Sequence, residues 1–127
     1  MKFASADWCV AFKEALDKDP QVYKGLADPG SFNFKMAIGM EDQHFHIEFQ
    51  KGKVSYLSEP KFDEKELDFM IMGELDAWQS AAAGEAATQL LSKGKFAFKK
   101  GSMSTAVKNA ATFNAIMKNM GKVPTEW

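Results

Sequence analysis

The hydrophobic and polar positions of this chain follow two periods that alternate along the sequence. Between Gly94 and Gly101, two phenylalanines, Phe96 and Phe98, alternate with lysine and alanine, which predicts a strand with one apolar face. After Gly101 the period becomes helical, and one stripe holds Met103, Ala106, Val107, Ala110, Phe113, Met117 and Met120. Ser102 is a suitable N-cap and Gly121 a suitable C-terminal residue, so we expect one long helix between them.

Three earlier segments also alternate with period two. Residues 31–38, 44–50 and 54–56 place their apolar side chains on one face: Phe32, Phe34, Met36, Ile38, Phe45, Ile47, Phe49, Val54 and Tyr56. Short turns join them, so an antiparallel meander with an apolar inner face and a solvent-exposed outer face is expected. Residues 67–72 form a fourth strand that becomes apolar on both faces at Met70 and Met72, which is typical of a strand inside a sheet.

Helical periodicity accounts for most of the remaining chain. An amphipathic helix is expected over residues 5–18, a short helix from Pro20 to Leu26, and two more near 75–82 and 86–91. The predicted order is helices, three strands, a fourth strand, helices, a fifth strand and a long helix. This order predicts an α/β (α+β) two-layer fold in which helices cover one face of the sheet, within a single domain over residues 1–127.

Composition removes several classes of function. The net charge is −1 and all sixteen cationic residues are lysines, so no arginine is present to read bases or to clamp phosphates in a bidentate manner. Nucleic acid is therefore not expected as a partner. Cys9 is the single cysteine, which excludes an intrachain disulfide and a cysteine-based metal site. The sequence has no secretory signal and no apolar run of about 18 residues, so a cytoplasmic location is expected.

Two groups of polar residues have spacings that catalysis or metal binding can use. His44, His46 and Glu48 alternate on the same predicted strand face, but that face is expected to be exposed to solvent, and no metal site is predicted. Glu66 and Asp68 also share a face and are candidates for an acid/base pair, although ion pairing or exposure explains them better. No nucleophile elbow, phosphate loop or dinucleotide fingerprint is present, so we predict no catalytic residue and no cofactor.

Several stretches of the sequence together resemble a known family. The run Gly94-Lys-Phe-Ala-Phe-Lys-Lys-Gly101, the following helix, the Gly52-Lys-Val54 hairpin and the strand 67–72 together resemble the sterol carrier protein type 2 domain over about residues 30–121. The resemblance implies a five-stranded, mostly antiparallel mixed sheet with an apolar tunnel between sheet and helices. It also implies binding of fatty acids, fatty acyl-CoA or sterol-like lipids. The absence of a peroxisomal C-terminal tail favours a free-standing prokaryotic-type member.

The predicted tunnel lining combines this resemblance with the apolar pattern. It consists of Met36, Phe45, Phe49, Met70, Met72, Trp78, Leu90, Phe98, Met103, Val107, Asn114, Met117 and Met120. Flexible methionines suit a pocket for varied acyl chains, and they are equally suited to filling an ordinary core. Asn114 either orients a polar head group or caps a buried carbonyl.

Two exposed features have open alternatives. The lysines at 93, 95, 99 and 100 either hold a carboxylate or CoA phosphate or form a solvated face. The first helix, with Trp8 and Phe12, either docks on a membrane or packs on its own sheet, and the second is expected.

The predicted function is therefore non-catalytic binding and transfer of a lipid or acyl ligand. The alternatives are a small enzyme of acyl or steroid chemistry and a tunnel-free dimerising interaction module. The expected partners are the ligand itself and at most a transient membrane surface, with the chain as a monomer or homodimer.

Overall fold

The computed structural model describes all 127 residues. Its helices and strands are α1 (Ala6–Lys18), α2 (Pro20–Lys24), η1 (Pro29–Ser31), β1 (Phe34–Met40), β2 (Gln43–Gln50), β3 (Lys53–Ser58), η2 (Glu64–Glu66), β4 (Phe69–Gly73), α3 (Leu75–Ala82), α4 (Ala87–Ser92), β5 (Phe96–Lys100), α5 (Met103–Lys108), α6 (Ala110–Lys118) and η3 (Asn119–Lys122). None of the helices has the length and apolar character needed to cross a bilayer.

The five strands form one mixed sheet in the order β3-β2-β1-β4-β5. β1 pairs antiparallel with β2, β2 with β3, and β4 with β5, whereas β1 and β4 are parallel. The predicted five-stranded, mostly antiparallel mixed sheet is confirmed. β4 lies between two strands, which explains why both of its faces carry apolar residues.

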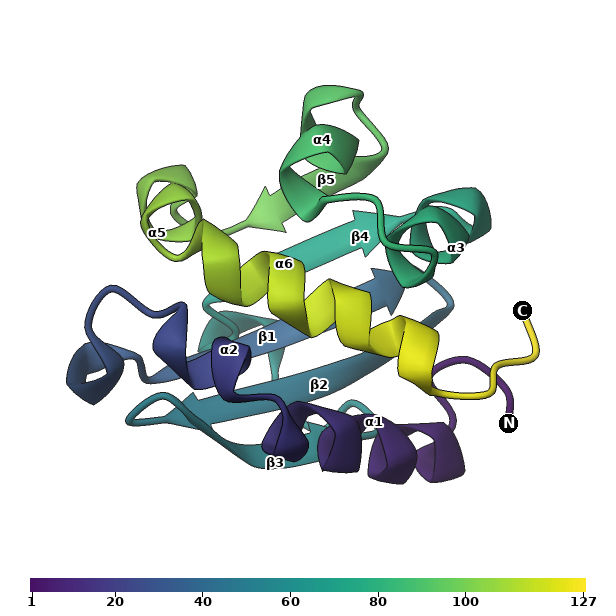
Figure 1. Cartoon of the computed structure of the whole chain (residues 1–127), viewed down its shortest axis with the longest axis horizontal. Helices are drawn as coiled ribbons and strands as arrows, with labels where there is room; N and C mark the ends of the chain where they lie inside the picture. Colours follow the sequence, from purple (N-terminus) through teal and green to yellow (C-terminus); the bar gives the residue numbers. More distant parts are fainter.

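The helices α1, α2 and α6 lie over one face of the sheet, with α6 crossing it diagonally (Figure 1). Aromatic side chains fill the space beneath them. Trp8, Phe12 and Phe45 are completely buried, and the Trp8 ring centroid lies 4.8 Å from that of Phe12 and 5.5 Å from that of Phe45. The apolar side of α1 thus packs on its own sheet, as expected, rather than facing outward.

The prediction of one long helix after Ser102 is wrong in one respect, because the helix is interrupted. α5 ends at Lys108 and α6 begins at Ala110, and Asn109 between them departs from helical geometry, with φ −110° and ψ 25°. The Asn109 side chain is buried; its Oδ1 accepts a hydrogen bond from the Ala27 N–H at 3.0 Å, and its Nδ2 donates to the Thr105 carbonyl at 2.9 Å. A side chain that competes for backbone partners in this way ends a helix locally.

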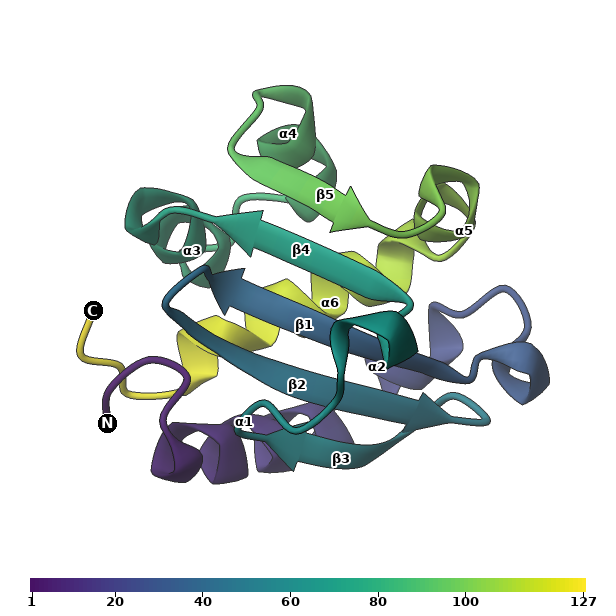
Figure 2. The same cartoon turned by 180° about the vertical axis from the view of Figure 1, so that it is seen from behind.

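The opposite face of the sheet is less exposed than its pattern predicts. Figure 2 shows the segment between β3 and β4 folding back across this face. His46 is 3% exposed; its Nδ1 accepts hydrogen bonds from the Lys61 and Phe62 N–H groups, each at 3.1 Å, and its ring stacks on Phe62. The expectation of a solvent-exposed His46 is therefore wrong. Burial, with a smaller contribution from His44, lowers the pKa of His46 to about 4.

A bulge in the β2–β3 pairing produces a second departure. Phe49 pairs with Val54, but Glu48 pairs with Tyr56, so one extra residue of β3 lies between the two pairs. The extra residue turns Tyr56 to the outer face, where its ring lies 5.7 Å from that of Phe62. Val54 alone keeps the predicted contact with the core.

Candidate functional site

An apolar pocket lies between α4, β5, α5 and α6. Its void is about 40 Å³, and ten of its eleven lining residues are hydrophobic: Ala87, Thr88, Leu91, Phe96, Phe98, Met103, Ala106, Val107, Ala110, Phe113 and Met117. Thr88 supplies the single polar side chain. A wall of this composition gives a hydrocarbon group contact without offering charge.

Each element contributes residues at its own period. α4 supplies Thr88 together with Ala87 and Leu91, which lie one helical turn apart. Phe96 and Phe98 alternate on β5, and the apolar stripe that continues from α5 into α6 supplies the other six lining residues. Gly101 turns the chain from β5 into α5 with φ 128°, a conformation that favours glycine, and a Cβ there would overlap the Phe69 ring. Gly101 thus makes the turn that brings α5 over the pocket.

α5 is held by few buried side chains. Ala106 is its only buried residue, whereas Met103 is 45% exposed and Val107 67% exposed although both line the pocket. Ser102 caps the helix by accepting a hydrogen bond from the Thr105 N–H at 3.3 Å. A six-residue helix with one buried side chain has little packing to hold it in place.

Asn114 of α6 lies beside the pocket and caps α4. Its Oδ1 accepts a hydrogen bond from the Ala87 N–H at 2.9 Å, while the N-cap position Ala86 offers no side-chain acceptor. The structural role of Asn114 is therefore to cap a backbone group, but the group is the Ala87 N–H and not the buried carbonyl that was expected.

Apart from Asn114, the predicted lining residues divide among three places. Phe98, Met103, Val107 and Met117 line the pocket. Six others lie in the main core and are almost completely buried: Met36, Phe45, Phe49, Trp78, Leu90 and Met120. Met70 and Met72 lie on the far face of the sheet, in a small cluster with Ala37, Leu67 and Phe62.

Seven pocket residues were absent from the predicted lining. Three of them, Ala106, Ala110 and Phe113, belong to the helical stripe that the sequence does show, so stripe membership was the available signal. The other four are Ala87, Thr88, Leu91 and Phe96. Their meeting depends on how α4 and β5 approach α6, which no local pattern specifies.

The lysine cluster does not reach the pocket. Lys93 pairs with Glu85 and Lys95 with Asp76, each at 2.8 Å, and Lys99 pairs with Glu41. The hydrogen bond and ion pair between Lys95 and Asp76 lower the pKa of Asp76 and raise that of Lys95. Three of the four lysines are therefore neutralised by carboxylates of this chain.

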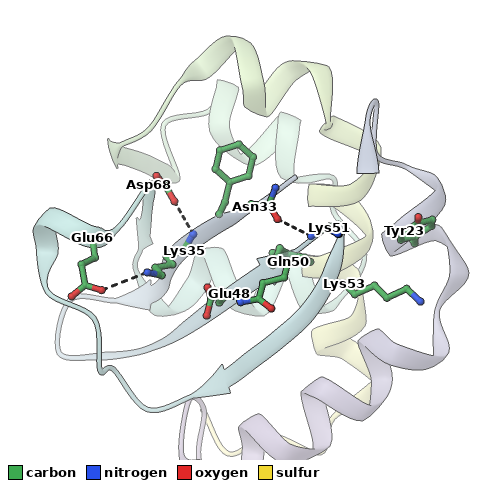
Figure 3. A pocket seen from close by; sticks show the side chains of 11 residues that line it. Tyr23, Asn33, Lys35, Glu48, Gln50, Lys51, Lys53, Glu66 and Asp68 are labelled. Atoms are coloured by element: carbon green, nitrogen blue, oxygen red, sulfur yellow. Dashed lines mark hydrogen bonds and ion pairs between the residues drawn. The ribbon is translucent and has the colours of Figure 1, made fainter. Parts of the chain in front are cut away.

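A much larger hollow of the molecule is polar. It has a volume of about 1020 Å³ and lies where β1 begins and β2 ends, and only three of its eleven lining residues are hydrophobic (Figure 3). Lys35 lies at its centre: its Nζ is 3.5 Å from Glu66, and its backbone N–H donates to Asp68 Oδ2 at 2.9 Å. Glu66 and Asp68 are thus occupied in joining β1 to the segment before β4. This hollow suits a lipid chain poorly.

Comparison with known proteins places this architecture in a family. The model of the SCP-2 sterol transfer family matches residues 12–114, and the chain belongs to that family. No curated protein sequence matches it significantly.

Two solved structures share the fold. A crystal structure of sterol carrier protein 2 is 16% identical, with 97% of this chain and 100% of that chain covered and a TM-score of 0.75. The solution structure of a conserved hypothetical protein from Thermus thermophilus, described as a candidate sterol carrier protein, is 17% identical, with 99% and 92% covered and a TM-score of 0.73.

Proposed function

We propose that the chain binds the apolar part of a lipid between α4, β5, α5 and α6 and carries it without changing it chemically. The ligand class is a fatty acid, a fatty acyl-CoA or a sterol-like molecule. The observation that supports this most directly is the pocket itself, with ten hydrophobic residues among its eleven. Membership of a sterol transfer family supports lipid binding in general.

Removal of hydrocarbon from water supplies the driving force. Each buried methylene contributes about 0.8 kcal/mol, so ten methylenes supply about 8 kcal/mol before costs. Opening the site and ordering the chain offset part of this gain. Few polar contacts are then required for binding.

The site must enlarge to admit such a ligand. Its void of about 40 Å³ compares with roughly 300–1,000 Å³ for typical small-molecule sites. α5 is the element suited to move, since it buries only Ala106 and is bounded by Gly101 and the break at Asn109. Met103 and Met117 add unbranched side chains that repack at low cost.

The head group of the ligand is expected to remain outside. The lining has no cation and one hydroxyl, that of Thr88, so nothing within it recognises a carboxylate or phosphate. Selection by the hydrocarbon chain of the ligand rather than by its head group predicts a broad range of ligands.

The cytoplasmic location of the protein stays a prediction.

Native mass spectrometry of the delipidated protein tests the proposal. Adding oleate, palmitoyl-CoA or cholesterol should give one-to-one complexes with at least one of them, and a fluorescent fatty acid should become brighter on binding. An unchanged protein mass with all three lipids, together with an unchanged probe, would contradict the proposed function.

A further inference from the structure

The polar hollow where β1 begins and β2 ends is lined by as many cations as carboxylates. Lys35 and Glu48 lie opposite each other in its lining and alternate with Met36 and Ile47, which are buried beneath the helices. Both charged side chains therefore project from the face of the sheet opposite α6, and the hollow is separate from the apolar pocket. Its charged lining residues are Lys35, Lys51, Lys53, Glu48, Glu66 and Asp68.

The charges of opposite sign are separated along the hollow. Figure 3 shows Glu66 and Asp68 at one end and Lys51 and Lys53 at the other. Lys35 offsets one of the two carboxylates, since its Nζ lies 3.5 Å from Glu66, but Asp68 bonds only a backbone N–H and keeps its charge. Neither Lys51 nor Lys53 forms an ion pair within the chain. One end is therefore negative and the other positive.

The sheet holds the two ends too far apart to neutralise each other. Asp68 directly precedes β4 and Lys53 begins β3, and these strands are the outer members of the row β3-β2-β1-β4. Three strand spacings of roughly 4.8 Å separate their backbones by about 14 Å. An extended peptide advances roughly 3.3–3.6 Å per residue, so about four residues span this separation.

The middle of the hollow offers hydrogen-bonding groups that the chain itself leaves free. Asn33 Oδ1 accepts from the Lys51 N–H at 2.9 Å, while the Asn33 Nδ2 makes no hydrogen bond. Gln50 Nε2 donates to Glu48 at 3.4 Å, and the Gln50 Oε1 has no donor. One free donor and one free acceptor match a peptide group, which carries one of each.

We propose that this hollow binds a short zwitterionic peptide in extended form. The terminal ammonium group of the peptide lies against Glu66 and Asp68, its terminal carboxylate lies against Lys51 and Lys53, and its central amides bond the two amide side chains between them. A ligand of one charge sign is a poorer match, because it meets like charges at one end of the hollow. The inference goes beyond the proposed lipid binding and does not depend on it.

NMR titration of the full chain with three forms of tetra-alanine tests the proposal. The first form has free termini, the second an acetylated N-terminus and the third an amidated C-terminus. We expect the free peptide to shift the backbone amide signals of residues that line the hollow. Blocking either terminus should weaken binding at least three-fold, since it removes the contact with one charged end.

Two matched variants locate the binding. Lys53→Gln removes a cation from the hollow and should weaken binding of the free peptide, but it should leave binding of the C-amidated peptide unchanged. Lys108→Gln is the control, because Lys108 is an exposed lysine on α5 outside the hollow, and it should bind all three peptides as wild type does. Absence of shifts with the free peptide, equal binding of the three peptides, or equal behaviour of the two variants overturns the proposal.

Discussion

The Oδ1 atom of Asn114 accepts a hydrogen bond from the Ala87 N–H at 2.9 Å, so α6 caps the first turn of α4 across one wall of the apolar pocket. Ala87 is itself a lining residue, and Asn114 is only partly buried. The one polar interruption of the apolar stripe therefore has a structural partner. It holds two walls of the pocket together.

Replacing Asn114 by alanine should lower the free energy of unfolding by about 1 kcal/mol, because the Ala87 N–H loses its acceptor. Urea denaturation measures the change. Asn114→Asp replaces the amide oxygen by a carboxylate oxygen near the start of α4 and should retain most of the stability. If both variants retain full stability and lose binding of a fluorescent fatty acid, Asn114 contacts the ligand instead.

Filling the pocket should block the ligand. Ala110 lines the void and Ala111, its neighbour on α6, is exposed. Ala110→Leu places three further carbons in a space of about 40 Å³, and we expect at least a ten-fold loss of fatty-acid probe affinity. Ala111→Leu is the matched control and should bind the probe as wild type does. Equal affinities of the two variants would place the ligand elsewhere.

The break between α5 and α6 should depend on Asn109. Asn109→Ala removes the acceptor of the Ala27 N–H and the donor to the Thr105 carbonyl, and we expect a loss of about 1–3 kcal/mol in thermal or urea unfolding. Asn109→Asp preserves the acceptor but not the donor and should lose less. A fully stable Asn109→Ala variant would show that neither hydrogen bond determines the break.

His46 should make stability depend on pH. The folded chain binds a proton on His46 near pH 4, whereas an unfolded chain binds one near pH 6.5. Protonation therefore favours unfolding as the pH falls from 6.5 towards 4, with a loss of up to about 3 kcal/mol. His46→Asn retains an acceptor for the Lys61 and Phe62 N–H groups and does not titrate, so its unfolding free energy should change less over this range. Identical pH profiles for the variant and wild type would refute this role.

Much of the fold could be predicted because local patterns determine it. Alternation at Phe34, Met36 and Ile38 and at Phe45, Ile47 and Phe49 places the strands and their inner faces. The departures arise where distant segments meet. Asn109 breaks a continuous stripe through its bond to Ala27, and His46 becomes buried because residues 59–62 fold over it. The local hydrophobic period around Asn109 and His46 gives no sign of either Ala27 or residues 59–62.

The candidate site could be predicted only in part for the same reason. The stripe through Met103, Val107 and Met117 identifies one wall, and the alternation at Phe98 identifies another. Apolar character alone does not separate a pocket wall from a filled core, so Met36 and Trp78, which are completely buried, carry the same signal. Strand geometry places Met70 on the outer face only once the pairing of β4 is known.

Methyl NMR of the methionines tests the location of the site most directly. The eight methionines include Met103 and Met117 in the pocket, Met36 in the core, and Met70 and Met72 on the far face of the sheet. Titrating [¹³C-methyl]methionine-labelled protein with a spin-labelled fatty acid should broaden the Met103 and Met117 signals first and leave Met70 and Met72 sharp. Broadening confined to Met70 and Met72, or no broadening at saturating ligand, would contradict lipid binding in this pocket.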